Sequence, residues 1–391
     1  MKAITDRFRP GDRGALALWL GAWLGVMFVV AVAPRALPAL FDSRPYLDRW
    51  AQWDAVRFTK LATYGYDGPP WEKFDPGWPA FFPGYPLALR AVGALVGDLR
   101  AAGLLISLVA GAVAVVALAR LGNDAERAQV TDATSGEGGE RAPSGRLGTM
   151  AVVAMLAGPG AVFLFAGYSE SLFLAFALPA WLCARRGQWM WAGLLAMPAS
   201  AVRITGLFLV LAMLVEYAVG AHGRRSGGLR PAGWLVLPFL PLAAYTFYQW
   251  TRTGDWMAWQ HAQEAGWDRK FTMPWDALDL TWQAAFAVDN EFTLAFRIEL
   301  AAAAVGVALT VFLLLRRRWP EATYVGLQLV ALMTSSYYLS IGRATLLWWP
   351  LWLALGGMAV RWPRAFAGLV AAALPFAVLQ LLTFTSGAWA G

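Results

Sequence analysis

The sequence has very few residues of the kinds that form disulfide bonds or bind metals. Cysteine occurs once in 391 residues and histidine twice. A single cysteine excludes a disulfide bond within the chain and makes a thiolate metal site unexpected. Cys183 lies in an apolar run, where a small buried side chain is the simplest interpretation. His261 has no neighbouring cluster of histidine, cysteine or carboxylate residues, so we predict neither a metal site nor a cofactor.

Motifs of soluble nucleotide-dependent enzymes and of serine hydrolases are also missing. The chain has no glycine-rich phosphate loop and no Ser–His–Asp pattern. It also has no segment that reads as a soluble nucleotide-binding domain. We therefore expect any activated substrate to reach the protein through the membrane.

Charged residues are scarce, at 15% of the chain, whereas a soluble domain usually has about 25%. Hydrophobic residues make up 59%, and apolar runs of about 20 residues recur, each long enough to cross a bilayer core of roughly 30 Å. The short alternating segments of a membrane β-barrel are absent. These features predict an all-α polytopic membrane protein. The net charge of +7 fits basic cytoplasmic loops and lipid phosphates, so no nucleic-acid partner is expected.

The positions of basic residues give the predicted spans a direction. Lys2, Arg7, Arg9 and Arg13 place the N-terminus in the cytoplasm, and every short loop on that side is then basic. No small-residue cleavage site follows the first apolar run, so we predict an uncleaved span there. The C-terminus falls outside. The eleven predicted spans are 15–33, 101–120, 147–166, 169–184, 188–202, 204–221, 232–249, 292–315, 321–337, 344–360 and 365–384.

Three connections between the spans are long. Segments 34–100 and 250–291 are predicted outside and are rich in tryptophan. Within the first of these, 82–97 is too short to cross and is predicted to be an interfacial helix. Segment 121–146 has no aromatic residues and mixed charge, which predicts a disordered cytoplasmic loop. We find no internal repeat, which weakens a transporter built from inverted halves.

Several isolated polar residues fall at one predicted depth on the outer side, although they come from distant parts of the chain. A helical bundle builds a binding site at its mouth in this way. These residues are Asp54, Glu170, Arg203, His261, Arg269 and Arg343.

Asp54 lies in the amphipathic stretch "RWAQWDAVRFTKLA". As one helix this stretch places Trp50, Asp54, Arg57 and Phe58 on one face, and its tryptophans predict that it lies along the outer interface. Asp54 would then face the bundle or the headgroups. The alternative is a surface ion pair between Asp54 and Arg57, which would matter little.

The other charged candidates stand in apolar surroundings. Ser169 is a plausible N-cap that places Glu170 in the first turn of a helix, at the positive end of its dipole. Arg203 and Arg343 interrupt apolar segments, where an arginine usually has a partner or a function. A lipid-linked phosphate suits a guanidinium. The alternatives are an ion pair with Glu170 or a snorkelling side chain.

Five stretches taken together resemble one protein family. They are "WDAVRFTKLATYGYDG", "AFFPGYPL", "FLFAGYSESLFLAFAL", "ASAVRITGLFL" and "IGRATLLWWP". In this order and spacing, over about residues 50–350, the chain resembles the PIG-V type of GPI mannosyltransferases and their bacterial relatives, within the GT-C membrane glycosyltransferases. The eukaryotic pattern Thr-Arg-Ser-Asn-Gly is here Val-Arg-Ile-Thr-Gly, from Val202 to Gly206. The arginine is kept and its polar neighbours are not, so the acceptor is left open.

The resemblance implies a GT-C-type bundle that transfers mannose, with inversion, from a polyprenyl-phosphate donor to a lipid or glycan acceptor. It implies that Asp54 is the general base, on the extracytoplasmic face of what the composition suggests is a bacterial membrane. Beside Asp54, the predicted donor- and substrate-binding residues are Arg203, Arg343, Glu170, Tyr168, Trp53, Arg57, His261 and Arg269. Two alternatives remain: the same fold using another polyprenyl-phosphate sugar, or a transporter of lipid or sugar.

Overall fold

The computed structural model describes residues 10–134, 145–220 and 228–389. Apart from one isolated β-bridge between Phe271 and Ser335, its regular elements are helices. They are α2 (Pro10–Ala36), η1 (Tyr46–Arg49), α3 (Asp54–Tyr64), η2 (Gly65–Asp67), η3 (Trp78–Ala80), α4 (Gly84–Val96), α5 (Leu99–Thr134), α6 (Arg146–Ala157), η4 (Pro159–Ala161), α7 (Val162–Phe165), α8 (Ser169–Arg185), α9 (Trp189–Val202), α10 (Thr205–Val219), η5 (Pro231–Val236), α12 (Phe239–Thr253), α13 (Ala258–Trp267), α14 (Pro274–Phe286), α15 (Thr293–Leu315), α16 (Trp319–Met333), α17 (Ile341–Ala344), η6 (Thr345–Leu347), α18 (Trp349–Arg361) and α19 (Pro363–Ser386).

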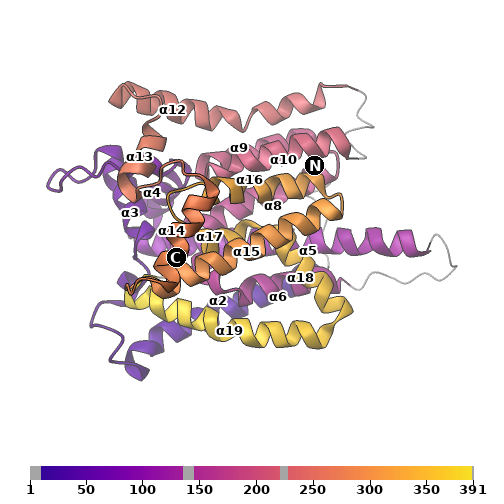
Figure 1. The fold of residues 1–391 in the computed structure, drawn as a ribbon, viewed down its shortest axis with the longest axis horizontal. Coiled ribbons are helices and arrows are strands. Elements are labelled where there is room, and N and C mark those ends of the chain that lie inside the picture. Colours follow the sequence, from indigo (N-terminus) through magenta and orange to yellow (C-terminus); the bar gives the residue numbers. More distant parts are fainter. Residues whose placement is uncertain (1–9, 135–144, 221–227, 390–391) are drawn as a thin grey trace.

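The long helices lie side by side as a bundle (Figure 1). α5 packs on α2, α4, α6 and α8, while α10 packs on α16 and α18 on α6. Small residues allow the closest crossings, since a Cβ added at Gly356 of α18 would lie 2.6 Å from the carbonyl oxygen of Leu147 in α6. Such close backbone approach is typical of helix packing in membranes.

Within the described residues, four helices are long and apolar enough to cross a membrane by length and composition. They are Gly11–Ala36, Leu99–Ala128, Thr293–Leu315 and Pro363–Ser386. The predicted span 147–166 is instead two helical pieces bent by 80°, because Pro159 cannot continue the ladder of α6. Helices α8, α9, α10, α12, α16 and α18 occupy the other predicted spans but have only 13–17 residues. They cover about 20–26 Å, so the number eleven is not confirmed.

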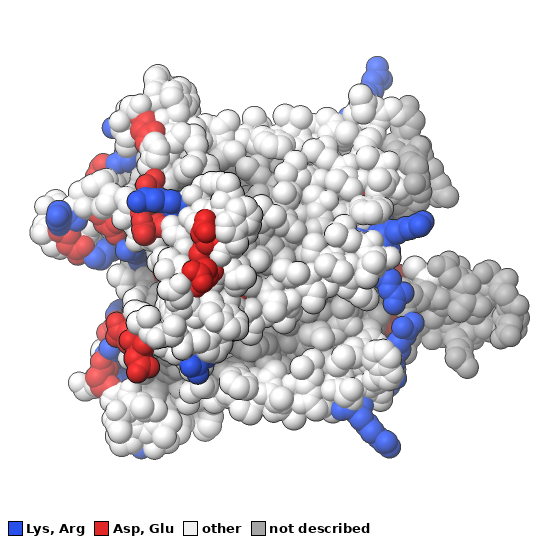
Figure 2. Space-filling model, viewed as in Figure 1, with Lys and Arg blue, Asp and Glu red and all other residues white. Residues whose placement is uncertain are grey.

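Charged side chains gather at two ends of the bundle and leave an uncharged band between them on the face shown (Figure 2). Basic residues dominate one end, where arginines pair with carboxylates of neighbouring helices. Arg120 binds Asp12 at 2.8 Å and Arg185 binds Glu216 at 3.0 Å. The other end carries both signs of charge. This distribution, together with the apolar helices, is that of a membrane-embedded protein.

We expect the basic end to face the cytoplasm. Short cytoplasmic loops are enriched in lysine and arginine, so a membrane-impermeant maleimide should label Lys73→Cys in intact cells and Arg364→Cys only after permeabilisation. Both positions are exposed in the structure, and the natural Cys183 is buried, which keeps the background low. The reverse labelling pattern would invert the topology.

The segment 121–146, predicted to be a disordered loop, is partly helical. α5 continues without a break to Thr134, so the prediction is wrong for 121–134, and 135–144 lies outside the described residues. Residues 125–129, Ala-Glu-Arg-Ala-Gln, are strong helix formers and favour helix over coil. The predicted interfacial segment 82–97 forms the short helix α4.

The two long segments that were predicted to lie outside meet at the end of the bundle opposite the basic one (Figure 1). Segment 34–100 folds into η1, α3, η2, η3 and α4, and segment 250–291 supplies α13 and α14. α13 packs against η3, where the rings of Trp267 and Phe81 lie 5.5 Å apart. Together these segments cover the ends of α10 and α16 and enclose a cavity.

Candidate functional site

A cavity of about 430 Å³ opens at this end of the bundle. Its charged lining residues come from separate parts of the chain: Asp54, Arg203, Arg269, Lys270 and Arg343. Four cations and one carboxylate therefore face the same space, and an anionic ligand fits such a wall. A larger open groove of about 670 Å³, lined by Arg44, Asp48 and Arg100 among others, does not contain these residues.

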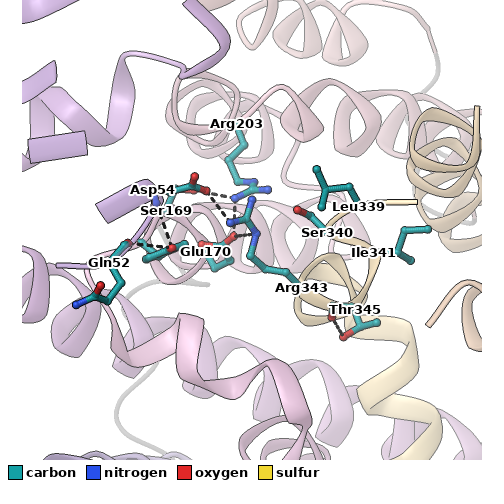
Figure 3. A network of polar contacts seen from close by, with 12 residues as sticks. Gln52, Asp54, Ser169, Glu170, Arg203, Leu339, Ser340, Ile341, Arg343 and Thr345 are labelled. Carbon is teal, nitrogen blue, oxygen red and sulfur yellow. Dashed lines mark hydrogen bonds and ion pairs between the residues drawn. The ribbon is translucent and has the colours of Figure 1, made fainter. Parts of the chain in front are cut away.

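Asp54 is the first residue of α3. Its Oδ2 accepts a hydrogen bond from Arg343 Nη1 at 2.6 Å. The Asp54 backbone N–H donates to the Tyr168 hydroxyl, which in turn donates to the carbonyl oxygen of Gln52, both at 3.2 Å (Figure 3). Tyr168 thus fixes the start of α3. Among the described residues none donates a hydrogen bond to Oδ1, which leaves this oxygen able to accept a proton.

Glu170 lies beneath the cavity and is fully buried. Its Oε1 accepts a hydrogen bond from Arg203 Nη1 at 2.7 Å and lies 3.3 Å from Arg343 Nε. Arg203 Nη1 also donates to Ser169 Oγ at 2.8 Å. One buried carboxylate therefore holds both arginines, as the ion-pair alternative from the sequence required (Figure 3). The expected N-cap is wrong by one residue: Tyr168 is the N-cap and Ser169 begins α8.

Arg343 stands on the four-residue helix α17, and a buried carboxylate holds this turn in place. Glu299 of α15 accepts backbone hydrogen bonds from Ser340, Ile341 and Gly342 at 2.8, 2.6 and 3.3 Å. Ser340 has the left-handed φ of 65°, which places three successive N–H groups in a concave arrangement that suits an anion. The guanidinium of Arg343 also lies 5.6 Å from the ring centroid of Tyr168.

We expect Glu299→Gln to loosen the turn that carries Arg343. An amide has only one acceptor oxygen, so at least one of the three N–H groups would face an N–H₂ donor. An unsatisfied buried donor costs about 1–3 kcal/mol. Thermal unfolding of the purified variant should show a lower melting temperature. Glu291→Gln is the matched control because Glu291 is exposed, and equal melting of both variants would contradict the role of Glu299.

Arg269, between α13 and α14, lines the cavity with donors to spare. Its Nη2 donates to the carbonyl oxygen of Leu339 at 3.0 Å, and its Nε has no hydrogen-bond partner in the described part of the chain. Burial, and next the charge of Arg343, lower the pKa of Arg269 to about 10. The guanidinium stays charged at neutral pH. It adds a positive charge to the wall of the cavity.

Two predicted site residues lie away from the cavity. Arg57 pairs with Asp75 at 3.2 Å and lies 4.7 Å from the ring centroid of Trp267. Arg57 therefore packs behind Trp267, which lines the cavity. The alternative ion pair between Arg57 and Asp54 is not formed. His261 is exposed and its Nδ1 lies 2.6 Å from Asp255 Oδ2, so it is not a lining residue. Trp50 is also not on the predicted helical face, because α3 begins only at Asp54.

The structure adds residues that the sequence did not single out. Glu299 is a carboxylate inside the apolar run of α15, and a charge in such a run is a usable signal. Trp389 lines the cavity beside Trp53, and Gln328 of α16 lines it with its Oε1 unbonded to any described residue. Nothing in the local pattern around Trp389 indicates its place, because only the tertiary fold brings it there.

Within residues 10–134, 145–220 and 228–389, no three residues of the metal-binding types lie close enough together to hold an ion. Comparison with known proteins adds no relative. No protein-family model matches the sequence, and no curated protein matches it.

Proposed function

We propose that this protein is a membrane glycosyltransferase that transfers mannose from a polyprenyl-phosphate-mannose donor to a hydroxyl group of a lipid or glycan acceptor, on the extracytoplasmic face. The observation that carries the proposal is the cavity in which the free Oδ1 of Asp54 lies beside three arginines. The motifs that resemble the PIG-V type surround this cavity in the fold, since they supply Asp54, Tyr168, Arg203 and Arg343.

The proposed reaction uses Asp54 as general base. The acceptor oxygen attacks the anomeric carbon of the donor sugar, and Asp54 Oδ1 takes the hydroxyl proton. The bond between that carbon and the phosphate oxygen breaks, and its electron pair leaves with the polyprenyl phosphate. Attack from the face opposite the leaving group inverts the anomeric configuration. The base must stand within about 3 Å of the proton it removes.

The arginines suit the leaving phosphate. Arg203 makes its hydrogen bonds to described residues through Nη1, and both Arg203 and Arg269 line the cavity. A guanidinium binds phosphate oxygens through paired N–H donors. Fixed positive charges around the phosphate stabilise the negative charge that grows on it as the bond breaks. No nucleotide or metal is assigned a part in this proposal.

The rest of the cavity suits the lipid part of the donor. Phe208 of α10 and Leu332 of α16 line it together with Ala331 and Leu347. These side chains are apolar, and the first units of a polyprenyl chain would be buried against them. The lining therefore has arginines for an anionic group, Asp54 and tryptophans for a sugar, and apolar side chains for a lipid chain.

One observation favours an enzyme over the transporter alternative. The charged residues of the cavity all lie at one end of the bundle, and Glu170 and Glu299 lock two of its walls through multiple hydrogen bonds. A rigid, one-ended site suits catalysis better than alternating access. The test includes donors with other sugars, so that it also measures which sugar is transferred.

The decisive experiment follows donor turnover in proteoliposomes. In separate reactions, purified protein is given polyprenyl-phosphate-mannose or the glucose- or arabinose-linked lipid. A lipid extract is the source of acceptors in each reaction. Release of sugar-free polyprenyl phosphate, with the sugar recovered in a larger product, reports transfer to an acceptor, whereas recovery of free sugar reports hydrolysis. We expect the mannose donor to release polyprenyl phosphate faster in vesicles with the protein than in vesicles without it. Release from only a different sugar lipid would change the proposed donor sugar, and release from none of the three would overturn the proposal.

A further inference from the structure

Trp53, next to Asp54, holds a backbone conformation that normally belongs to glycine. Its φ is 51° and its ψ −116°, and the N–H of Ala55 donates to the carbonyl oxygen of Gln52 at 3.0 Å across it. These are the angles of the first central position of a type II′ turn. A side chain there costs about 1–3 kcal/mol. A tryptophan in such a position indicates that its ring is needed there.

The segment after α19 reaches this ring from the other end of the sequence. Gly387, with a φ of 92°, ends α19 and turns the chain toward α3. The indole Nε1 of Trp53 donates to the carbonyl oxygen of Ala388 at 3.2 Å. The rings of Trp53 and Trp389 then meet edge to face, with centroids 5.0 Å apart and planes at 87°.

Both rings line the cavity and stay partly open to it. Trp53 is 42% exposed and Trp389 is partly buried. Two indoles at right angles form a corner with an apolar, electron-rich face on each side. Asp54 and Arg343, which are hydrogen-bonded to each other, line the same cavity as this corner.

We propose that the corner formed by Trp53 and Trp389 binds a pyranose ring, with Trp389 as a specificity-determining residue of the substrate site. A sugar ring presents C–H groups to an aromatic face and keeps its hydroxyl groups at its rim, where Asp54 and Arg343 can bond to them. A polyprenyl chain has no hydroxyl groups to match these partners and fits the wall of α10 and α16 instead. The inference rests on the proposed function, because it names the part of the site that receives a sugar.

The ring can belong to the donor or to a sugar acceptor, and three probes separate these sources. They are polyprenyl phosphate without sugar, polyprenyl-phosphate-mannose, and methyl α-mannoside as a free sugar. Binding of each to purified protein in detergent is measured by thermal shift over a range of concentrations. The variants are Trp389→Ala, Trp389→Phe and, as control, Trp362→Ala, which removes an exposed indole between α18 and α19.

We expect Trp389→Ala to weaken binding of a sugar-bearing probe about 3- to 10-fold, the usual range for a lost aromatic contact. Binding of sugar-free polyprenyl phosphate should not change. Trp389→Phe should keep most of the affinity, and Trp362→Ala should match the wild type. An effect on the lipid-linked sugar assigns the corner to the donor, and an effect on methyl α-mannoside alone assigns it to the acceptor.

Three results would overturn the inference. Trp389→Ala could leave both sugar probes unaffected, or it could weaken sugar-free polyprenyl phosphate equally, which would show a purely structural role. A wild-type protein that binds polyprenyl phosphate but neither sugar probe would also remove it. Failure of the proposed function looks different, because it is seen in turnover and not in binding: the wild type then releases no lipid phosphate from any sugar donor.

Discussion

Asp54→Asn should leave the protein folded and able to bind its donor but remove most of its turnover. Asparagine has nearly the same size and can still accept a hydrogen bond from Arg343, but it cannot take a proton at neutral pH. Loss of a general base typically costs about 10²–10⁴-fold in rate. The measurement is release of polyprenyl phosphate by wild type and variant at saturating donor, with melting temperatures determined in parallel.

The control for this experiment is Asp279→Asn. Asp279 is an exposed aspartate of α14 whose Oδ2 accepts a hydrogen bond from Gln283 in the same helix, so its variant should turn over like the wild type. If Asp54 serves only to hold Arg343, the Asp54→Asn change should lower stability and spare the rate. A well-folded Asp54→Asn protein with near wild-type turnover would therefore remove Asp54 as the base, and Glu170 would become the next residue to test.

Arg343→Ala should weaken donor binding more than Arg343→Lys. Arg343 joins Asp54 to Glu170 through two nitrogens, at 2.6 and 3.3 Å, and lines the cavity where the phosphate is proposed to bind. Lysine keeps the positive charge but has no planar fork to reach both carboxylates. A hydrogen bond to a charged group contributes about 1.5–3 kcal/mol, so alanine should cost on the order of 10- to 100-fold in donor affinity, and lysine less.

Stability must be measured beside affinity, because alanine leaves Glu170 with one arginine instead of two. Arg364→Ala is the matched control, since Arg364 is exposed on the opposite end of the bundle. Equal donor affinity in the wild type and both Arg343 variants would place Arg343 outside the phosphate site. It would then act only as the ion-pair partner of Asp54 and Glu170.

The sequence predicted which charged residues belong to the central cluster better than it predicted which of them form ion pairs. Asp54, Glu170, Arg203 and Arg343 were expected at one depth, and they meet in one network. A lone charge in an apolar run needs a partner, which makes membership readable from sequence. Partner choice depends on distances of a few ångströms between segments far apart in the chain. Arg57 shows this limit, since its carboxylate is Asp75 of the following loop.

The positions of the helices could be predicted from the sequence for a similar reason, but the number of membrane spans could not. α9 and α10 begin and end within a few residues of the predicted ranges, because apolar runs and polar breaks mark them. Hydropathy averages over a window, so it joined α6 to η4 and α7 although Gly158-Pro159-Gly160 bends the chain by 80°. Among the short helices, α8 is mostly buried whereas α12 has only two buried residues, Tyr245 and Gln249. Hydropathy alone does not distinguish these two cases.

The order in which the chain is made has a consequence for the ion pairs of the site. Glu170 and Arg203 are 33 residues apart, whereas Asp54 and Arg343 are 289 residues apart. At about 5–20 residues per second, the roughly 140 residues between Arg203 and Arg343 take about 7–30 s to synthesise. Of the two guanidiniums that lie beside Glu170 in the structure, Arg203 is therefore the only one already synthesised during this time. An Arg203 variant should therefore be retained by the insertion machinery or degraded during biogenesis, before any defect in the mature protein can be measured.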